Sequence, residues 1–456
     1  MVRRVAVIGS GYVGTVVAAC LAHIGHKVVG VESDSAKLAS LARGKAPFFE
    51  QGLDELLRAG TEAGRLSFTS DLGRAVEESE LTFICVGTPA RPDGKPDMSA
   101  MEAVAAAVAP HLKRPHIFVN KSTVPVGAGR WLSSAVAEAA GNHRVAQLVR
   151  VVSNPEFLRE GTAVSDFLHP DRVVLGADDA AALDEVVELY QPVLQQSFPG
   201  SDGRAQVPLV RADLMTAEMI KYAANVFLAT KISFANEIAR FCELVGADVQ
   251  TVAAGVGLDQ RIGPRFLGAG LGWGGSCFTK DLSAMIALAG EYGYQARLLE
   301  AAMGINADQR QLAVEKLLRR LKNLRGARVA LLGLSYKPGT DDLRDSPGVD
   351  IAGRLIERGA FVTAYDPVVR EVPGEERIRV MADAYSAAAG ADAVVVATEW
   401  PQFLDLDWRR LRAVTAGDLL FDGRNCLDPA VVQEAGFVYE GVGRRAPLRL
   451  ARDRAA

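Results

Sequence analysis

The sequence lacks any apolar run close to the roughly 20 residues that cross a bilayer, and it does not open with a hydrophobic export segment and cleavage site. We therefore expect a cytoplasmic protein. An excess of charge of one sign is also missing, because the formal net charge of the 456 residues is −4. This balance gives no reason to expect nucleic acid or an anionic membrane as a partner.

Cysteine is scarce as well: the chain has 5 cysteines, scattered and without a Cys-x-x-Cys pair. An odd and scattered set argues against a disulfide framework or a zinc site, and for a reducing compartment. The 6 histidines show no metal-ligand spacing, so no metal is predicted. The length is sufficient for two or three domains of ordinary globular composition.

Apolar runs of strand length alternate with helical patterns in both halves of the chain. Such alternation predicts parallel strands joined by crossover helices. Between the two halves, residues 212–246 are typical of one long helix whose apolar side chains point in several directions and have to be covered. We predict an α/β protein with two Rossmann-like doubly wound domains, joined by a long central helix and a helical connector. The strand-like runs are "VAVIG", "KVVGVE", "LTFICVG", "HIFVNKS", "LVRVVSNP", "RVALLGL", "FVTAYDP", "DAVVVATEW" and "DLLFDGRN".

A dinucleotide-binding pattern lies at the first strand. Gly9, Gly11 and Gly14 follow this strand and open a helix, the context in which Gly-x-Gly-x-x-Gly cradles a pyrophosphate. Glu32 ends the next strand, where a carboxylate accepts hydrogen bonds from the ribose and repels a 2′-phosphate, so NAD is favoured over NADP. Lys37 is the one nearby cation that could oppose this preference. The second half lacks the spacing, and a single dinucleotide site is predicted.

Four further segments carry reactive side chains. Each alone has a simple structural explanation: a capped turn, a solvated acidic loop, a lysine extended to solvent, or a small buried thiol. The alternative for Cys277 is a nucleophile, because glycines precede it and an ammonium follows. The segments are "KSTVPVG" with Ser122 and Thr123, "NPEFLREG" with Glu156 and Glu160, "EMIKYAAN" with Lys221 and Asn225, and "GWGGSCFTKD" with Cys277, Lys280 and Asp281.

Together these segments resemble the UDP-glucose/GDP-mannose dehydrogenase family, and within it the UDP-glucose 6-dehydrogenases, from the first strand to about residue 440. GDP-mannose and UDP-N-acetylhexosamine 6-dehydrogenases are the rivals within the family. A nucleotide-sugar-binding protein without chemistry is the rival of another class. The matching motifs are "GxGYVG", "STVPVG", "NPEFLREG", "EMIKYAAN", "RIGPRFL", "GWGGSCFTKD", "GLSYKPGTDDLRDSP" and "FDGRN".

The resemblance implies a four-electron oxidation of the C6 alcohol of UDP-glucose to UDP-glucuronate, a precursor in polysaccharide biosynthesis, with NAD as the cofactor. It makes Cys277 the nucleophile that forms a thiohemiacetal and then a thioester. Lys221 and Asn225 stabilise oxyanions, and Lys221 also takes the alcohol proton. Asp281 and Thr123 hold water or share a proton, and Glu156 acts as acid and base in hydrolysis.

The resemblance also implies binding residues. Some relatives carry a lysine where this chain has Gly268, which puts one substrate contact in doubt. Trp273 stands where other aromatics occur and still offers a flat face for stacking. Arg261 belongs to a neighbouring subunit's site in relatives, so at least a homodimer is implied. The cofactor set is Gly9, Gly11, Tyr12, Val13, Gly14, Glu32, Lys37, Val86, Gly87, Thr88, Pro89, Ala90, Ser122, Thr123, Val124, Glu160, Lys280 and Arg344. The substrate set is Glu156, Phe157, Leu158, Arg159, Lys221, Asn225, Arg261, Phe266, Leu267, Gly268, Gly272, Trp273, Gly274, Cys277, Tyr336, Lys337 and Arg424.

The predicted domain boundaries follow from this division of roles. Residues 1–205 form the NAD-binding domain, and residues 206–305 form a helical dimerisation region with the cysteine loop. Residues 306–440 form the UDP-sugar-binding domain, and residues 441–456 are a flexible tail.

Overall fold

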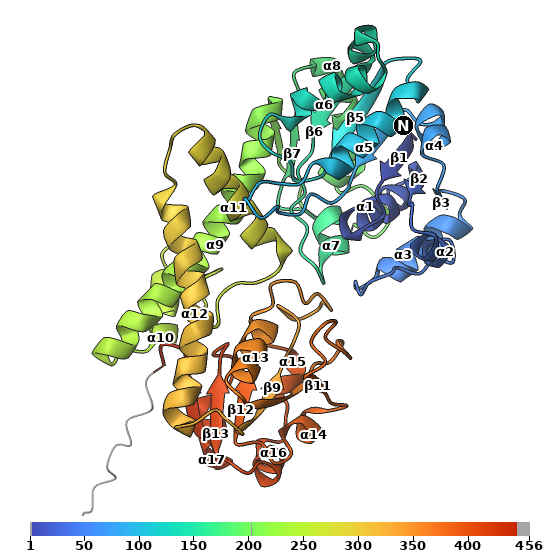
Figure 1. Ribbon diagram of the computed structural model, residues 1–456. Helices are drawn as coiled ribbons and strands as arrows, with labels where there is room; N and C mark the ends of the chain where they lie inside the picture. The colour runs from blue at the N-terminus through green and yellow to red at the C-terminus, as the bar shows by residue number, and fades with distance from the viewer. Residues whose placement is uncertain (1, 202, 445–456) are drawn as a thin grey trace, which may run out of the picture. The chain divides into compact units, whose positions relative to one another are not determined.

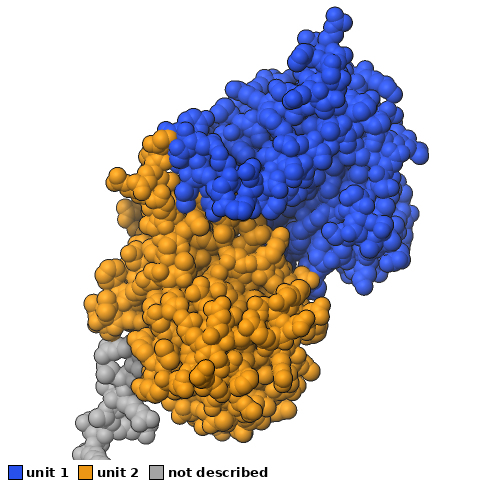
Figure 2. All heavy atoms as spheres, in the orientation of Figure 1, with its two compact units in different colours: residues 1–224, 283–292 blue, residues 225–282, 293–456 orange. Residues whose placement is uncertain are grey.

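The computed structural model describes residues 2–201 and 203–444. These residues form an α/β protein with two sheets and long helices between them in the sequence (Figure 1), which confirms the predicted fold class. The chain divides into two compact units, residues 1–224 with 283–292 and residues 225–282 with 293–456 (Figure 2). This division does not coincide with the boundaries predicted from the sequence, and those boundaries stay a prediction.

The first unit contains an eight-stranded sheet in the order β3-β2-β1-β4-β5-β6-β7-β8. Every residue of the central strands β4 (Leu81–Ile84) and β5 (His116–Asn120) is buried. Burial on both faces explains why apolar residues occupy consecutive positions here, as at 83–84 and 117–119, instead of alternating. The sequence predicts parallel strands throughout, but β6 and β7 are antiparallel, joined at Ser153 and Gly176.

The other strands of this sheet are β1 (Arg4–Ile8), β2 (Lys27–Val31), β3 (Leu66–Thr69), β6 (Val149–Ser153), β7 (Val173–Gly176) and β8 (Leu209–Ala212). The helices of the unit before α9 are α1 (Tyr12–His23), α2 (Ser35–Leu41), α3 (Leu53–Glu62), α4 (Leu72–Glu78), α5 (Ser99–Val108), α6 (Ala128–Ala139), α7 (Ala163–Leu168) and α8 (Ala180–Leu194), with the short 3-10 helices η1 (Ala109–His111) and η2 (His143–Leu148).

The second unit contains a six-stranded sheet in the order β11-β10-β9-β12-β13-β14, and all of its strand pairs are parallel. This order repeats that of the first six strands of the larger sheet. Its elements are β9 (Arg328–Leu332), α13 (Pro347–Glu357), β10 (Phe361–Tyr365), β11 (Ile378–Val380), α14 (Ala384–Ala388), β12 (Ala393–Val396), α15 (Pro401–Leu404), α16 (Trp408–Val414), β13 (Leu419–Asp422), α17 (Pro429–Glu434) and β14 (Val438–Gly441).

The predicted long helix is confirmed as α9 (Leu214–Val245), which continues from the first unit into the second. It is followed by α10 (Val249–Gly257), α11 (Ser276–Glu291) and α12 (Arg297–Leu321). In the second unit, α12 lies beside α9, and the Ser233 hydroxyl donates to the carbonyl oxygen of Ala302 at 2.7 Å. No helix among the described residues combines the length and apolarity of a membrane span.

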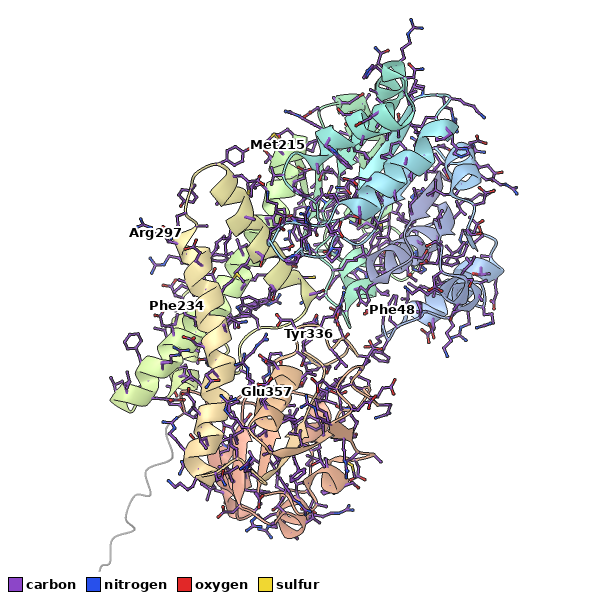
Figure 3. The ribbon with its side chains drawn as sticks, in the orientation of Figure 1. Phe48, Met215, Phe234, Arg297, Tyr336 and Glu357 are labelled. Atoms are coloured by element: carbon purple, nitrogen blue, oxygen red, sulfur yellow. The ribbon has the colours of Figure 1, made fainter. Side chains whose placement is uncertain are left out.

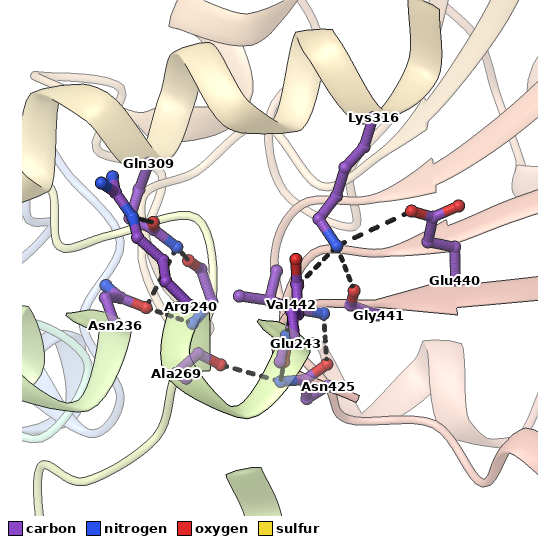
Figure 4. Close-up of polar contacts among 12 residues, drawn as sticks. Asn236, Arg240, Glu243, Ala269, Gln309, Lys316, Asn425, Glu440, Gly441 and Val442 are labelled. Atoms are coloured by element: carbon purple, nitrogen blue, oxygen red, sulfur yellow. Dashed lines mark hydrogen bonds and ion pairs between the residues drawn. The ribbon is translucent and has the colours of Figure 1, made fainter. Parts of the chain in front are cut away.

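A polar network fastens α9 and α12 to the second sheet (Figure 4). The buried Lys316 ammonium donates to Glu243 Oε1 at 2.6 Å and to the carbonyl oxygen of Gly441 at 3.0 Å. Asn425 donates from Nδ2 to the carbonyl oxygens of Ala269 and Val442. The loop that precedes α11 is therefore held to the edge of the same sheet.

The beginning of the predicted tail is packed against these elements. The Gly443 amide donates to Glu243 Oε1 at 2.8 Å, and Arg444 pairs with Asp248 at 2.9 Å. Residues 445–456, the rest of the tail predicted at 441–456, lie outside the described residues.

The long helix, whose apolar side chains are predicted to be covered on all sides, keeps some of them exposed among the described residues of the single chain. Phe227, Phe234 and Phe241 are 64%, 50% and 56% exposed, and Phe234 is labelled in Figure 3. They are spaced seven residues apart, so they follow one another along one face of α9. Within residues 2–201 and 203–444, this face of α9 therefore stays exposed.

Candidate active site

The glycine pattern after β1 forms a tight turn that leads directly into α1. Gly9 has φ +90°, and a Cβ on Gly14 would lie 1.8 Å from the carbonyl oxygen of Gly9. A Cβ on Gly11, the residue that precedes α1, would meet no atom within 4 Å. The helix therefore starts against the strand, with open space beside its N-terminus. That space fits a pyrophosphate, which the first amides of α1 would bind.

The loops after β4 and β5 meet beside this turn, where both of these strands end. Ser122 Oγ donates to the carbonyl oxygen of Val86 at 2.8 Å, and Thr88 Oγ1 donates to that of Thr123 at 2.6 Å. Because β1 lies between β2 and β4, the loops flank the point at which the strand order reverses, the usual ligand crevice of such sheets. The structure thus brings together the segments predicted for the cofactor: Val86, Gly87, Thr88, Pro89, Ser122, Thr123 and Val124.

Glu32 directly follows β2, as predicted. Its Oε1 accepts a hydrogen bond from the Asp34 amide at 2.9 Å, and Asp34 in turn caps α2 through the amides of Ala36 and Lys37. Glu32 is half-buried, whereas Lys37 is exposed. A carboxylate held at the end of β2 is suited to the hydroxyls of a ribose and unsuited to a 2′-phosphate.

Glu156 and Lys221 form a buried ion pair in the first unit. Lys221 Nζ lies 2.7 Å from Glu156 Oε1, and the two side chains are 6% and 9% exposed. Glu156 Oε2 accepts from the Leu158 amide at 2.7 Å. Burial alone would raise the pKa of Glu156. The charge and hydrogen bond of Lys221, the Leu158 amide and the Lys121 charge together lower it by more, so the net pKa is below its usual value. The pair is therefore a carboxylate facing an ammonium.

The rest of the "NPEFLREG" segment is fixed by contacts within the first unit. Arg172 stacks over the Phe157 ring at 3.6 Å, and Arg159 pairs with Asp166 at 2.5 Å. Beyond Glu160, the buried Glu50 carboxylate accepts from the amides of Gly161 and Ala163 at 2.6 and 2.8 Å, and from the hydroxyl of Tyr12 in the glycine pattern. Glu50 thus couples this segment to the cofactor turn.

Cys277 lies in the second unit as the second residue of α11, which begins at Ser276. The sequence places the thiol in a glycine loop, whereas the structure ends the loop at Gly275 and puts the thiol in the first turn of a helix. The thiol is exposed. The amide dipoles at a helix N-terminus stabilise a thiolate, so the position suits a nucleophile.

Two further predicted residues meet one turn along α11. Asp281 is buried, and its Oδ2 accepts from Asn225 Nδ2 at 2.6 Å while its Oδ1 accepts from Lys280 Nζ at 2.7 Å. Asn225 lies one turn beyond Lys221 on α9. The Asp281 carboxylate thus orients the Asn225 amide and is itself neutralised by Lys280.

The loop before α11 is packed tightly against its own unit. Trp273 is 5% exposed, its indole nitrogen donates to Ser233 Oγ at 3.1 Å, and Asn306 bonds both its amide and its carbonyl. The flat face proposed for ligand stacking is therefore covered by protein. A Cβ on Gly274 would lie 2.4 Å from the Asp345 carbonyl oxygen. Glycine here permits contact between two protein segments.

Arg424 connects three of the segments predicted for the substrate. Its guanidinium donates to the carbonyl oxygens of Ala397 at 2.7 Å, Gly272 at 3.1 Å and Tyr336 at 3.3 Å. Lys337 follows Tyr336, which is labelled in Figure 3. This arrangement concentrates cationic side chains beside the glycine loop, as a diphosphate requires.

Other predicted residues lie at the margins of these groups. Arg344 pairs with Asp342 at 2.6 Å. Arg261 extends into solvent, 87% exposed, and pairs with Asp259 two residues earlier at 2.6 Å. In the segment that follows it, Leu267 is buried, Gly268 is exposed and Phe266 has a positive φ of 65°. No group of three or more His, Cys, Asp or Glu side chains within residues 2–201 and 203–444 is placed to hold a metal ion.

Three family descriptions match successive parts of the chain. Residues 3–194 match the NAD binding domain of the UDP-glucose/GDP-mannose dehydrogenase family, residues 215–308 its central domain, and residues 330–429 its UDP binding domain. The chain belongs to this family. Its resemblance at the level of motifs is thereby confirmed, and so are its identity as an NAD-dependent dehydrogenase and NAD as the cofactor.

Named relatives and solved structures extend the match over almost the whole chain. UDP-glucose 6-dehydrogenase TuaD of Bacillus subtilis is 41% identical, with 97% of this chain and 94% of that protein covered. A UDP-glucose 6-dehydrogenase of Rhizobium meliloti is 44% identical, with 97% and 99% covered. The structure of a UDP-glucose dehydrogenase from Pyrobaculum islandicum matches with a TM-score of 0.88 at 40% identity, with 97% and 98% covered.

The sequence left several residues of this enzyme's candidate site unpredicted. Lys121 lies directly after β5 and is buried at 5% exposure, and its Nζ donates to Asn154 Oδ1 at 3.0 Å. Glu50, which couples Tyr12 to Gly161, was also missed. A lysine that directly follows the strand-like run "HIFVN" is the signal that could have revealed Lys121, because charged side chains are seldom buried without a partner.

Proposed function

We propose that this dehydrogenase oxidises the C6 alcohol of UDP-glucose to the carboxylate of UDP-glucuronate, through a covalent adduct on Cys277. The observation that carries the proposal is the exposed Cys277 thiol in the first turn of α11, since ordinary two-electron alcohol oxidation needs no thiol. Relatives named UDP-glucose 6-dehydrogenases at 41% and 44% identity support the choice of sugar nucleotide.

Bound NAD supplies the hydride acceptor in each of the two oxidations. Gly11, the N-terminus of α1 and Glu32 are the residues that would hold its pyrophosphate and adenosine ribose. Thr88 and Ser122, whose hydroxyls join the neighbouring loops, would shape the remainder of the same site.

The first proton transfer falls to Lys221. To accept a proton from the C6 hydroxyl, Lys221 first has to pass one on, and Glu156 Oε1 is 2.7 Å away. The pair can therefore shift a proton from the substrate to the carboxylate through the amine, and Glu156 releases this proton to solvent before hydrolysis begins. Thr123, at the end of the loop tied to Thr88, would share the proton or hold a water molecule.

The thiolate of Cys277 then adds to the aldehyde carbon, forming a C–S bond and an alkoxide. Asn225 would donate a hydrogen bond to this oxyanion. One hydrogen of its side-chain amide is bonded to Asp281, which fixes the plane of the amide, and the second hydrogen would point to the oxyanion. The Lys221 ammonium, one turn away on α9, adds charge stabilisation. Loss of the second hydride leaves a thioester on Cys277.

Hydrolysis closes the cycle. Glu156 takes a proton from water, the resulting hydroxide adds to the thioester carbon, and the C–S bond breaks so that Cys277 leaves as a thiolate. The carboxylic acid that forms loses its own proton to give the carboxylate, and this proton and the one on Glu156 pass to solvent. The buried carboxylate of Glu156, kept ionised by its cationic neighbours, is suited to this role as a base.

Substrate choice is tested by measuring NADH production with UDP-glucose, UDP-galactose, UDP-N-acetylglucosamine and GDP-mannose. UDP-glucose is expected to exceed GDP-mannose at least about tenfold in kcat/KM, which corresponds to about 1.4 kcal/mol. Identity to a UDP-D-ManNAc dehydrogenase structure from Pyrococcus horikoshii is only 27%, although its TM-score is 0.84. Equal efficiency with GDP-mannose would remove the assignment to UDP-glucose and keep the family.

We also propose a homodimer in which the exposed face of α9 is the interface. The side chains at this interface would be buried away from water, as in the apolar cores of permanent interfaces. They are Phe227, Phe234 and Phe241. The exposed Arg261, as in relatives, would reach the neighbouring subunit's substrate. Arg261→Ala is then expected to raise the KM for UDP-glucose without lowering thermal stability.

Light scattering of Phe234→Glu tests the interface. This variant is expected to shift toward monomer, because a buried carboxylate without a partner is costly. Phe361→Glu is the matched control, because Phe361 is the first residue of β10 and is 67% exposed. A wild-type protein that scatters as a stable, active monomer would refute the dimer.

A further inference from the structure

Lys121 is a buried cation that the mechanism above does not use. It lies at the end of β5 with its ammonium 3.0 Å from Asn154 Oδ1, and that oxygen also accepts from the Tyr190 hydroxyl at 2.7 Å. The rings of Phe167 and Tyr190 lie 5.9 and 5.8 Å from Nζ. The ammonium is therefore fixed in place by one amide and two aromatic faces.

The Asn154 contact places this charge beside the segment that carries Glu156. Asn154 is two residues before Glu156, and its own amide donates to the carbonyl oxygen of Asn120, the residue before Lys121. The ends of β5 and β6 are thus locked together by a backbone bond and a side-chain bond. Glu156 consequently has two cationic neighbours, Lys221 from α9 and Lys121 from β5.

We propose that Lys121 is a positioning residue for the Glu156–Lys221 pair: its buried charge holds Glu156 in the carboxylate form that activates water. This inference rests on the proposed function for its catalytic meaning, but the electrostatic effect on Glu156 is a property of the first unit alone. Lys121 acts through Glu156 and Asn154, with no contact to the sugar required.

The energetics favour a tuning role over a stabilising one. Burial lowers the pKa of Lys121 to about 8, partly opposed by the Glu156 charge, and the Lys221 charge lowers this pKa further. The folded pKa thus lies below the unfolded value, so the contribution of Lys121 to stability increases as pH rises above about 8. At neutral pH the buried ammonium works against folding, and an apolar replacement is tolerated.

The other titratable groups around Lys121 do not take over its role. Burial raises the pKa of the Cys85 thiol to about 12 and that of the Tyr190 hydroxyl well above its usual value, so both stay neutral. Lys121 and Lys221 are then the two cations whose charges lower the pKa of Glu156. Removing the Lys121 charge leaves Glu156 with less compensation for its burial, and its pKa has to rise.

The test compares Lys121→Met with wild type by carbon-13 NMR titration of the Glu156 carboxyl, assigned with Glu156→Gln. We expect the Glu156 titration to move up by about one pH unit or more in Lys121→Met. The acid limb of the kcat profile with UDP-glucose should move up with it. Lys121→Arg, which keeps the charge, and Tyr190→Phe, which removes only a neutral hydrogen bond, should leave both close to wild type.

Each result decides one of two questions. If Glu156 titrates at the same pH in wild type and Lys121→Met, the proposal is overturned whatever the assay shows. If the titration moves but wild type does not oxidise UDP-glucose, the proposed function fails while the effect of Lys121 on Glu156 stands. Thermal melting near that of wild type confirms that Lys121→Met is folded, and Lys121→Gln replaces it in both experiments if it is not.

Discussion

The turns after the first strand of the two sheets are built alike, although only one has the dinucleotide pattern. Gly9 after β1 and Gly333 after β9 have φ angles of +90° and +100°. A Cβ on Gly14 would lie 1.8 Å from the carbonyl oxygen of Gly9, and a Cβ on Gly348 would lie 2.9 Å from that of Gly333. In both units a glycine at the start of the helix lets it approach the strand.

The difference lies in what separates the strand from the helix. In the first unit α1 begins at Tyr12, directly after the turn, whereas in the second unit α13 begins only at Pro347. The intervening residues 334–346 carry Tyr336, Lys337 and Arg344. The short turn exposes helix amides for a pyrophosphate, and the long one supplies cationic side chains. The same frame thus presents two kinds of group that suit phosphate oxygens, helix amides in one unit and cationic side chains in the other.

A second contrast concerns the acidic residue that follows the neighbouring strand. Glu32 after β2 is half-buried, and its Oε1 accepts a hydrogen bond from the Asp34 amide at 2.9 Å. Asp366, in the equivalent place after β10, is fully buried, and its Oδ2 accepts from the amides of Leu334 and Ser335 at 2.8 and 3.0 Å and from Trp400. The carboxylate after β2 accepts a local hydrogen bond from the next turn, whereas the one after β10 closes the long loop.

Cys277 belongs to neither of the two turns, so a change at Cys277 should affect the chemical step and leave ligand binding at the turns intact. Cys277→Ala removes the covalent adduct and should lower steady NADH production with UDP-glucose by at least about 1000-fold. The affinities for NADH and UDP should remain near wild type, since both turns are untouched. Fluorescence titration and calorimetry measure the two affinities.

Cys277→Ser sharpens this first prediction. The serine hydroxyl is a far weaker nucleophile, and an ester that forms slowly would appear in the intact mass as a hexuronosyl-nucleotide adduct. Turnover of Cys277→Ala within a few-fold of wild type would make the thiol a bystander and return the enzyme to ordinary alcohol oxidation.

The next largest effect tests whether the two turns serve different ligands. Gly14→Ala puts a methyl group into the Gly9 carbonyl, so α1 has to move, and NADH affinity should fall about 100-fold, or about 3 kcal/mol. Gly348→Ala produces a milder clash and should weaken UDP binding by about tenfold. Each variant is expected to spare the other ligand.

Measuring both ligands on both variants gives a crossed experiment in which each protein controls for the other. If Gly348→Ala weakened NADH as much as Gly14→Ala does, the assignment of the long turn to the diphosphate would be contradicted. A fall in both affinities for both variants would indicate a loss of folding, which the melting temperature detects.

The sequence predicts the first turn well and the second poorly for the same physical reason. The spacing of Gly9, Gly11 and Gly14 reports a short connection, so a local pattern is enough. Gly333 and Gly348 are separated by a long loop, and only the folded chain shows that a Cβ on one would meet the other. The long helix α9 was predictable from its uninterrupted apolar pattern.

In the candidate site, too, local motifs were predictable from the sequence and contacts between distant segments were not. Cys277, Lys221 and Glu156 lie in motifs that resemble a family, and their positions followed from that resemblance. The burial of Trp273 was not predictable, because it depends on Ser233 and Asn306 from distant segments. Pairings of this kind depend on tertiary packing, which no local spacing encodes.

The third prediction concerns Asp366. In Asp366→Asn the new amide presents hydrogens toward the amides of Leu334 and Ser335, so buried donors lose their acceptor. The free energy of unfolding should fall by about 3 kcal/mol, measured by denaturant titration. The corresponding change Glu32→Gln should leave stability close to wild type, because Glu32 is half-buried and accepts a single local hydrogen bond. Equal destabilisation by both would remove the second contrast between the sheets.

The smallest expected effect is on cofactor choice at Glu32. In Glu32→Gln the side chain keeps its size and one acceptor but loses the charge that repels a 2′-phosphate. The kcat/KM for NAD+ should fall about tenfold, or about 1.4 kcal/mol, while that for NADP+ should rise, since the exposed Lys37 would then face the phosphate unopposed. Adding Lys37→Met should reverse the rise with NADP+ and leave the value for NAD+ where Glu32→Gln put it. If wild type already turned over NADP+ as fast as NAD+, the carboxylate after β2 would have no selective role, and the difference between Glu32 and Asp366 would be one of burial alone.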